Sequence, residues 1–180
     1  MIKQLLLIVL GIVAIIAARA LFIPGSYSVQ RSITVQAPPE KIFPLLNDFE
    51  QFRQWSMSAK RDTAMAHQTS TPSAGPGAVY QWRGNAKAGS GRMEILESKA
   101  PTSVRIKLDF LAPVESSGIT DYTLIPVGTG TTVTWKTAGP TTFKSKVMQV
   151  FVSMAERLGG DIERGLASIK AIAERQALVR

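Results

Sequence analysis

The sequence predicts an α+β fold: a curved antiparallel β-sheet wrapped around a long C-terminal α-helix and preceded by one N-terminal transmembrane helix. Three observations predict it. An apolar run opens the chain, segments of alternating apolar and polar residues follow between short turns, and an amphipathic stripe closes it. Period-two alternation indicates strands with one buried face, whereas spacings of three and four indicate a helix. Tight turns between successive strands make the sheet antiparallel.

The N-terminal segment is long and apolar enough to cross a bilayer. The 19 residues from Leu5 to Ile23 carry one charge, that of Arg19. At about 1.5 Å per residue they reach roughly 28 Å, close to the thickness of a hydrocarbon core. Arg19 lies near the far end, where a long side chain can reach the headgroups. We therefore expect residues 1–25 to be a transmembrane anchor and residues 26–180 to be a soluble domain.

Two other interpretations of this segment stay open. Ala18-Arg19-Ala20 fits the small-x-small pattern before a cleavage site and Lys3 supplies a minimal positive region, so a cleaved signal peptide is one alternative. A buried core helix is the other. A short tail before an apolar run that continues to Ile23 favours an uncleaved export signal. We expect a single-pass protein of a bacterial inner (cytoplasmic) membrane, with its domain on the periplasmic, extracytoplasmic side.

The first part of the domain alternates and then becomes helical. From Tyr27 to Val35 every second residue is apolar apart from an arginine, which predicts a strand. Pro38-Pro39-Glu40 ends it, and proline followed by glutamate suits the first turn of a helix. Apolar residues recur at helical spacing from Ile42 to Phe49, and residues 51–55 are expected to form a second short helix. From Lys60 to Gly77 we expect a loop.

The rest of the chain predicts strands and then a helix. The expected strands lie at 78–83, 89–98, 104–110, 115–125 and 131–137. Gly139 to Thr142 then supply a break and a candidate N-cap. Apolar residues recur at spacings of three and four from Phe143 to Ala173, which predicts one helix of about 30 residues. Gly159-Gly160 marks either a kink in this helix or a close approach to the sheet. If the helix stands off the sheet, the two enclose an apolar cavity.

Composition limits the partners. Two of the 21 basic residues lie in the first 24 positions, so the remaining 19 face 13 acidic residues, a net charge of +6. Such a domain is attracted to anionic lipid headgroups. Its basic residues are scattered and form no cluster larger than Lys60-Arg61, so we expect no nucleic-acid partner. The absence of cysteine excludes disulfides, thiol nucleophiles and thiolate metal sites.

Five segments in order carry a resemblance to a known family. They are 29–43, which contains Ala37-Pro38-Pro39-Glu40; 48–56, which contains a tryptophan; 77–82, which reads Gly-Ala-Val-Tyr-Gln-Trp; 91–95; and 132–135. Over about residues 26–176 the chain resembles the START-like superfamily, also called the Bet v 1-like or helix-grip (SRPBCC) fold, and in particular its polyketide cyclase/dehydrase-type proteins. The resemblance implies the fold and not an activity, because the superfamily includes lipid carriers, hormone receptors, aromatase/cyclases and co-chaperones.

The sequence marks no catalytic machinery. His67 is the one histidine, and without cysteine it predicts no zinc site. Glu115 is the best candidate for an inward carboxylate, and Tyr122 is expected to face inward where its neighbour Asp121 faces outward. General acid–base catalysis needs a positioned group with a perturbed pKa, which no pattern here indicates. We expect no catalytic residue, no metal and no cofactor.

Aromatic and methionine side chains form the expected ligand-binding site. In the helix-grip fold eight of them would face the interior: Trp55, Trp82, Phe110, Tyr122, Trp135, Met148, Phe151 and Met154. A partly hollow core turns such residues into pocket walls, and methionine packs adaptably against apolar ligands. The hydroxyl of Tyr122 can orient a polar end of the ligand.

These observations predict a membrane-anchored binding protein for an apolar or amphipathic small molecule, such as a lipid, isoprenoid or polyketide-like compound. The ligand would lie between the sheet and the C-terminal helix. One alternative is a cyclase/dehydratase-type enzyme, which requires an inward ionisable group such as Glu115 or Tyr122. Another is a non-catalytic interaction module at the membrane surface, with a filled core and salt-sensitive binding.

Overall fold

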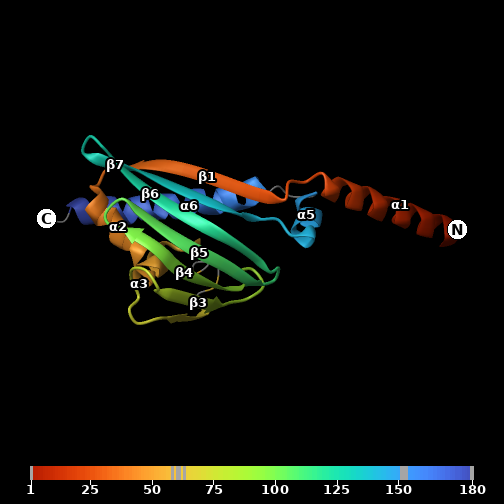
Figure 1. Ribbon diagram of the computed structural model, residues 1–180, viewed down its shortest axis with the longest axis horizontal. Coiled ribbons are helices and arrows are strands. Elements are labelled where there is room, and N and C mark those ends of the chain that lie inside the picture. Colours follow the sequence, from red (N-terminus) through yellow and green to blue (C-terminus); the bar gives the residue numbers. More distant parts are fainter. Residues whose placement is uncertain (1, 58, 60–61, 63, 151–153, 179–180) are drawn as a thin grey trace.

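The computed structural model describes residues 2–178 except 58, 60–61, 63 and 151–153. A seven-stranded antiparallel sheet curves around helices, and one helix projects from its end (Figure 1). The strands are β1 (Ser26–Val35), β2 (Ala66–Thr69), β3 (Val79–Arg83), β4 (Ser90–Lys99), β5 (Ser103–Ala112), β6 (Ser116–Val127) and β7 (Gly130–Pro140), in the spatial order β1-β7-β6-β5-β4-β3-β2. The helices are α1 (Ile2–Leu21), α2 (Pro39–Asn47), α3 (Phe49–Trp55), α5 (Phe143–Gln149) and α6 (Met154–Leu178).

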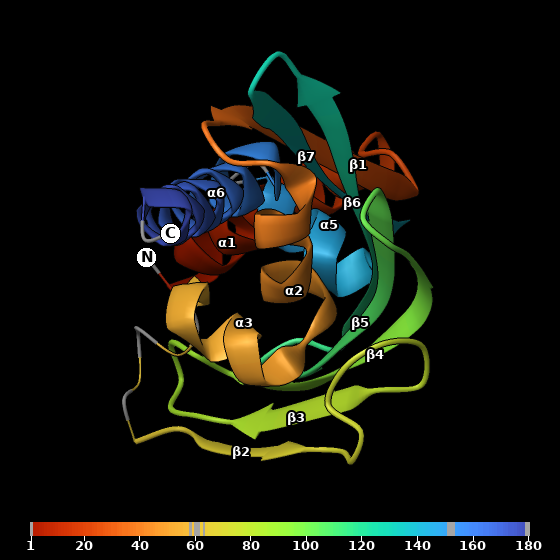
Figure 2. The same ribbon diagram turned by 90° about the vertical axis from the view of Figure 1, so that its left-hand side faces the viewer.

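The layers are those that the sequence predicts. The sheet bends around α2, α3 and α6, which lie inside its curve (Figure 2). In β1 the alternating pattern buries Val29 and Val35, while the residues between them are exposed or half-buried. Pro39 and Glu40 open α2, and the carboxylate of Asp48 caps α3 by accepting from the backbone N–H of Glu50 at 2.9 Å. The α+β helix-grip fold is therefore confirmed.

The C-terminal region differs from the expected single helix. It forms two helices, of which α5 ends at Gln149 and α6 begins at Met154. Gly159 lies inside α6 and marks a close approach to the sheet, because a β-carbon there would stand 2.5 Å from Nη2 of Arg31 on β1. The Nε of Arg31 binds Oε1 of Glu163 at 2.6 Å, which ties α6 to this edge of the sheet. In the expected loop, Ala66–Thr69 form β2 and pair with β3.

The register shows which strand ends lie nearest α1. β1 begins at Ser26, and this residue pairs with Pro140 at the end of β7. Farther across the sheet, the end of β7 faces the start of β6, which pairs with the end of β5 at Phe110. These strand ends therefore lie at the end of the sheet nearest α1, as Figure 1 shows. Buried residues toward the opposite end, including Val35, Leu45 and Ile169, belong to a filled hydrophobic core.

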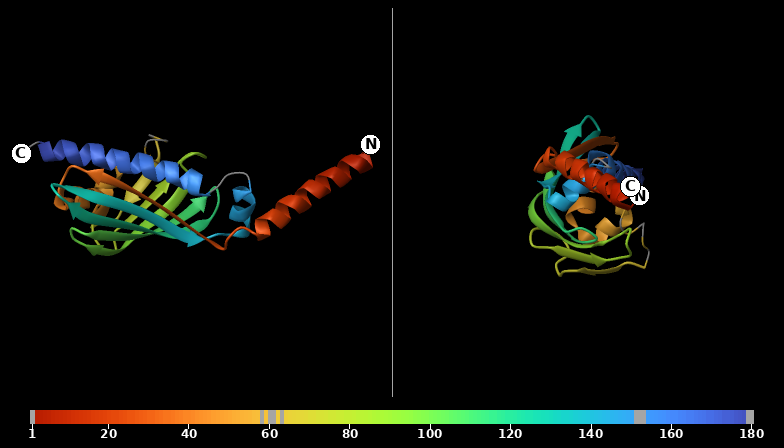
Figure 3. Two further views of the ribbon diagram at one scale, coloured as in Figure 1. Left: turned by 90° about the horizontal axis from the view of Figure 1, so that it is seen from above. Right: turned by 90° about the vertical axis from the view of Figure 1, so that its right-hand side faces the viewer.

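Helix α1 is apolar and long enough to span a membrane. It projects away from the sheet, at the end opposite the C-terminus (Figure 3). Its single buried residue is Ala20, while large apolar residues from Leu5 to Ile15 are more than half exposed. Helix α5 packs against it. Length and composition of this kind also fit a signal sequence.

Candidate functional site

A cavity of about 160 Å³ lies between the sheet and the first half of α6, toward the end that carries α1. Its sheet-side walls come from Tyr27 on β1 and from residues of β3 to β7, including Leu108 and Phe110 near the end of β5. Leu158 and Ile162 of α6 line the opposite side, and α3 with the residues after it lines a third. Apolar side chains thus form most of the surface, as in sites for small apolar ligands.

Trp55 lies at the centre of the aromatic wall. Its indole N–H donates to the carbonyl of Leu45 at 2.8 Å, so the end of α3 is fixed to α2. Its ring centroid lies 5.6 Å from that of Trp135 and 6.3 Å from that of Tyr122, both in edge-on geometry. Such pairs add roughly 0.5–1.5 kcal/mol beyond area burial. The three rings therefore form a wall of fixed shape.

A second wall depends on a glycine. The ring of Trp82 packs edge-on against Phe110 at 5.6 Å, and its indole N–H donates to the carbonyl of Ala88 at 3.2 Å. A β-carbon at Gly91 would stand 2.4 Å from Cη2 of Trp82 and 2.5 Å from the backbone oxygen of Asp109. The absence of a side chain at Gly91 lets Trp82 lie flat on the sheet, and this keeps the cavity open.

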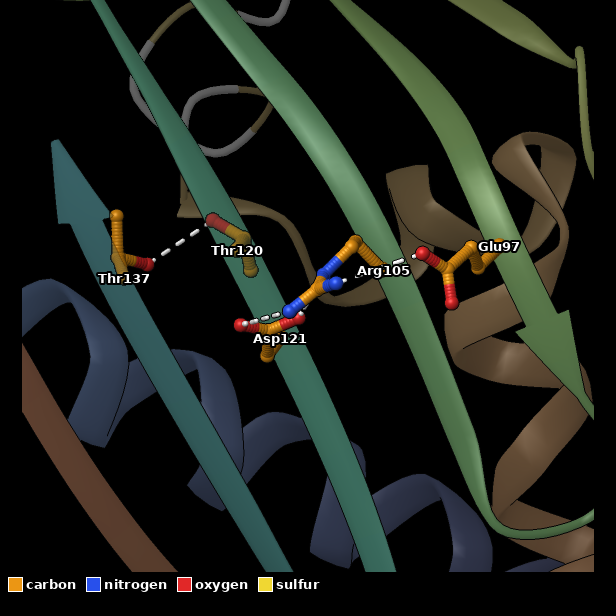
Figure 4. Close-up of polar contacts among 5 residues, drawn as sticks. All are labelled: Glu97, Arg105, Thr120, Asp121 and Thr137. Atoms are coloured by element: carbon orange, nitrogen blue, oxygen red, sulfur yellow. Dashed lines mark hydrogen bonds and ion pairs between the residues drawn. The ribbon is translucent and has the colours of Figure 1, made fainter.

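A polar strip crosses the sheet side of the cavity. Trp135 Nε1 donates to Oγ1 of Thr137 at 3.0 Å, and this oxygen lies 3.0 Å from Oγ1 of Thr120. Figure 4 shows the threonine pair on neighbouring strands. Residues next to each other on a strand face opposite sides, so Asp121 lies on the outer face, where Arg105 binds it at 2.7 Å. The ion pairs thus lie outside and the hydroxyls inside.

Two tyrosines add hydroxyl groups to the lining. Burial raises the pKa of Tyr122 well above its ordinary value of 10.0, and burial also raises the pKa of Tyr27. Both side chains are therefore protonated and neutral at physiological pH. Neither hydroxyl has a hydrogen-bond partner among the residues that the structure describes. Each can donate one hydrogen bond to a polar atom placed in the cavity.

The structure brings together five of the eight residues expected at the site. Trp55, Trp82, Phe110, Tyr122 and Trp135 line the cavity. Met148 lies on α5 with 40% of its surface exposed and is not part of the lining. Phe151 and the side chain of Met154 lie outside the described part of the chain.

Sequence reasoning missed several lining residues, notably Tyr27, Thr120 and Thr137. A usable pattern existed for two of them, because Tyr27 lies on the buried face of its strand and Thr120 is two positions before Tyr122. Glu115 and His67 are exposed and do not line the cavity. The lining carboxylate is that of Asp161, which is paired with Arg164. Among the described residues, no group of three or more His, Cys, Asp or Glu could hold a metal ion.

Comparison with known proteins agrees with this architecture. Protein CV1439 from Chromobacterium violaceum is 17% identical, with a TM-score of 0.58 over 84% of this chain and 99% of that chain. The KanY protein is 20% identical, with a TM-score of 0.60 over 84% and 99%. Ara h 8.0201 is 14% identical, with a TM-score of 0.56 over 87% and 100%. At these identities the likeness shows the fold alone. No curated protein matches the chain.

The family is shown by sequence. The model of the family described as "Polyketide cyclase / dehydrase and lipid transport" matches residues 26–174, which confirms the START-like resemblance. The description of this family supports the binding of a hydrophobic ligand. The chain belongs to the polyketide cyclase/dehydrase and lipid transport family.

Proposed function

We propose that the protein is a membrane-anchored binding protein for an apolar or amphipathic small molecule, held in the cavity between the sheet and α6. The observation that carries this proposal is the cavity itself, whose walls combine fixed aromatic rings with aliphatic side chains. Each 100 Å² of apolar ligand surface that leaves water contributes roughly 2.5 kcal/mol. Micromolar affinity needs about 8 kcal/mol after the costs of association, so the ligand must bury several hundred Å².

The volume of the cavity limits what fits. A cavity of about 150 Å³ in another protein takes up benzene. The 160 Å³ found here therefore suits a compact ring system or one end of a longer amphiphile. A long-chain lipid would need α6 to move away from the sheet. Isoprenoid and polyketide-like rings fit the space more readily than a complete phospholipid.

The membrane part of the proposal is supported by α1 and α5 together. Ile16 and Ala17 of α1 are half-buried and Ala20 is buried, on one face of the helix, and α5 is the element that contacts α1. With α1 spanning an inner membrane, α5 lies at the level of the headgroups, beside Arg19. Its exposed Phe143 and its lysines suit that interface. The domain would then lie on the periplasmic side, with the end that contains the cavity toward the bilayer.

The test of ligand binding is native mass spectrometry of the full chain, purified in a mild neutral detergent, followed by solvent extraction. We expect a stoichiometric apolar compound, absent from a Gly91→Ala variant in which Trp82 is displaced into the cavity. A chain that carries no compound and takes up no apolar dye would contradict the proposal and favour an interaction module. A carbonate wash of membranes, combined with the mass of the intact chain, tests the anchor: release of the chain or loss of residues 1–20 would contradict it.

A further inference from the structure

We propose that the cavity selects molecules whose polar end is uncharged, such as an alcohol, phenol or ketone, over the same molecules with a carboxylate or phosphate. This inference rests on the proposed function, because it concerns the ligand of the same cavity. It follows from the charges and hydroxyl groups that line the cavity.

The charges in the cavity disfavour an anion. Among the described residues no lysine, arginine or histidine lines the cavity, and the single acidic side chain in the lining is that of Asp161. Arg164 pairs with Asp161, but its own side chain is 60% exposed and is not part of the lining. A buried carboxylate without a cation loses its hydration, and hydrogen bonds from neutral hydroxyls replace only part of that loss.

The hydroxyls suit a neutral polar group. Thr137 accepts from the indole of Trp135, and one hydrogen is shared between Thr137 and Thr120. One of the two threonine hydroxyl hydrogens therefore remains free for another acceptor. The hydroxyl of Tyr122, whose residue is only 3% exposed, has no partner among the described residues. These groups can donate to and accept from a ligand hydroxyl or carbonyl.

Tyr27 completes this polar strip at the end nearest α1. A β-carbon at Gly118 would stand 3.0 Å from its hydroxyl oxygen, and one at Gly139 would stand 3.2 Å away. Two glycines on neighbouring strands thus make room for the tip of the tyrosine ring. The hydroxyls of Tyr27, Thr120 and Tyr122 lie on two strands of one wall, β1 and β6, so a polar atom of a ligand meets several donors and, among the described residues, no cation.

The test uses compact ligands that share one ring system. The full chain in neutral detergent is titrated at neutral pH with naphthalene, 2-naphthol, 2-naphthoate and 2-naphthylmethylammonium, and binding is followed by calorimetry. We expect 2-naphthol to bind at least about tenfold more tightly than 2-naphthoate, and the affinity of the acid to recover when it is protonated at acidic pH. Equal affinities for 2-naphthol and 2-naphthoate, or tightest binding of the ammonium compound, would overturn the inference while ligand binding itself stands. Failure of all four to bind would contradict the proposed function instead.

A pair of tyrosine variants tests the hydroxyl itself. Tyr122→Phe is expected to weaken 2-naphthol severalfold and to leave naphthalene unchanged. Tyr80→Phe is the matched control, because the Tyr80 hydroxyl is buried without a hydrogen-bond partner among the described residues and does not line the cavity. A Tyr122→Phe variant that weakens both ligands equally would show that the residue acts by packing alone, and would overturn its assigned role.

Discussion

The ring of Trp135 lies directly against Gly165 of α6, where a β-carbon would stand 2.6 Å from Cζ3 of the indole. Trp135 is also a wall of the cavity. The distance between α6 and the sheet is therefore set by a contact that only glycine permits, immediately beside the empty space.

The first prediction concerns this contact. Gly165→Ala is expected to lower the free energy of unfolding by up to about 2 kcal/mol, because overpacking costs about 1–3 kcal/mol and alanine returns about 1 kcal/mol of helix propensity. Urea denaturation measures it. The control is Gly160→Ala in the same helix, where the nearest atom is Nη1 of the flexible Arg164 at 3.5 Å. That variant should gain about 0.5–1 kcal/mol. Equal shifts in the two variants would contradict the steric argument.

The second prediction concerns Gly91. Gly91→Ala pushes either the ring of Trp82 or the backbone at Asp109 aside, since both lie within 2.5 Å of the new β-carbon. We expect a loss of about 1–3 kcal/mol in stability and a loss of naphthalene binding at temperatures where the variant is folded. Gly25→Ala is the control, with nothing within 4 Å of its β-carbon. Unchanged binding by Gly91→Ala would show that Trp82 does not bound the ligand space.

The third prediction concerns Trp55. Trp55→Phe removes a donor from the carbonyl of Leu45 and leaves a void in a fully buried site. The expected cost is about 2–4 kcal/mol, from the unpaired carbonyl and the lost packing together. Trp135→Phe, whose indole N–H bonds a threonine hydroxyl in a half-buried position, should cost less. Thermal denaturation of the two variants compares them, and the reverse order would refute the assigned role of Trp55.

The fourth prediction concerns alkaline pH. Burial raises the pKa of Tyr27, Tyr80 and Tyr122 above 10.0. The folded chain thus holds these protons more tightly than the unfolded chain does. The stabilisation is fully present below about pH 10 and is lost as the pH rises through the raised pKa values. Urea midpoints should fall above that pH, and less steeply for Tyr122→Phe. An equally steep fall in this variant would show that Tyr122 does not contribute.

The fifth prediction concerns α5, and the absence of cysteine makes it simple to test. A dye attached at Phe143→Cys in reconstituted membranes should be shielded from a water-soluble quencher. A dye at Leu178→Cys should be quenched fully, because Leu178 is 84% exposed at the far end of α6. Equal quenching at both positions would place α5 away from the lipid.

Much of the fold could be predicted because burial follows local patterns. Val29 and Val35 alternate with polar residues, and the turns between later strands are short. β2 could not be predicted, because Ala66, His67 and Gln68 are all exposed on an edge strand and show no contrast between faces. The separation of α5 from α6 could not be predicted from the sequence either. The apolar spacing continues from Phe143 onward, and α5 packs against α1 through contacts that no local pattern encodes.

The sequence predicts an apolar, aromatic interior, but it does not show which interior residues line the cavity. Trp55 and Phe110 could be assigned to the interior from their elements. Which interior residues line empty space depends on the distance between α6 and the sheet, and this distance depends on Gly165 and Trp135, which are far apart in the sequence. The sequence does not mark Thr120 and Thr137 as lining residues, because threonine is common in strands whatever its side chain contacts.

If α1 spans a membrane, as proposed, the short connection between α1 and β1 keeps the domain beside that membrane. Only residues 22–25 separate the two elements, a span of at most about 14 Å when fully extended. The carbonyl of Gly25 is further held by the N–H of Thr141 at 2.9 Å. With α1 embedded, the protein cannot shuttle cargo across an aqueous compartment. It would stay at the membrane, and its ligand would exchange either with the adjacent lipid phase or with a second protein that binds there.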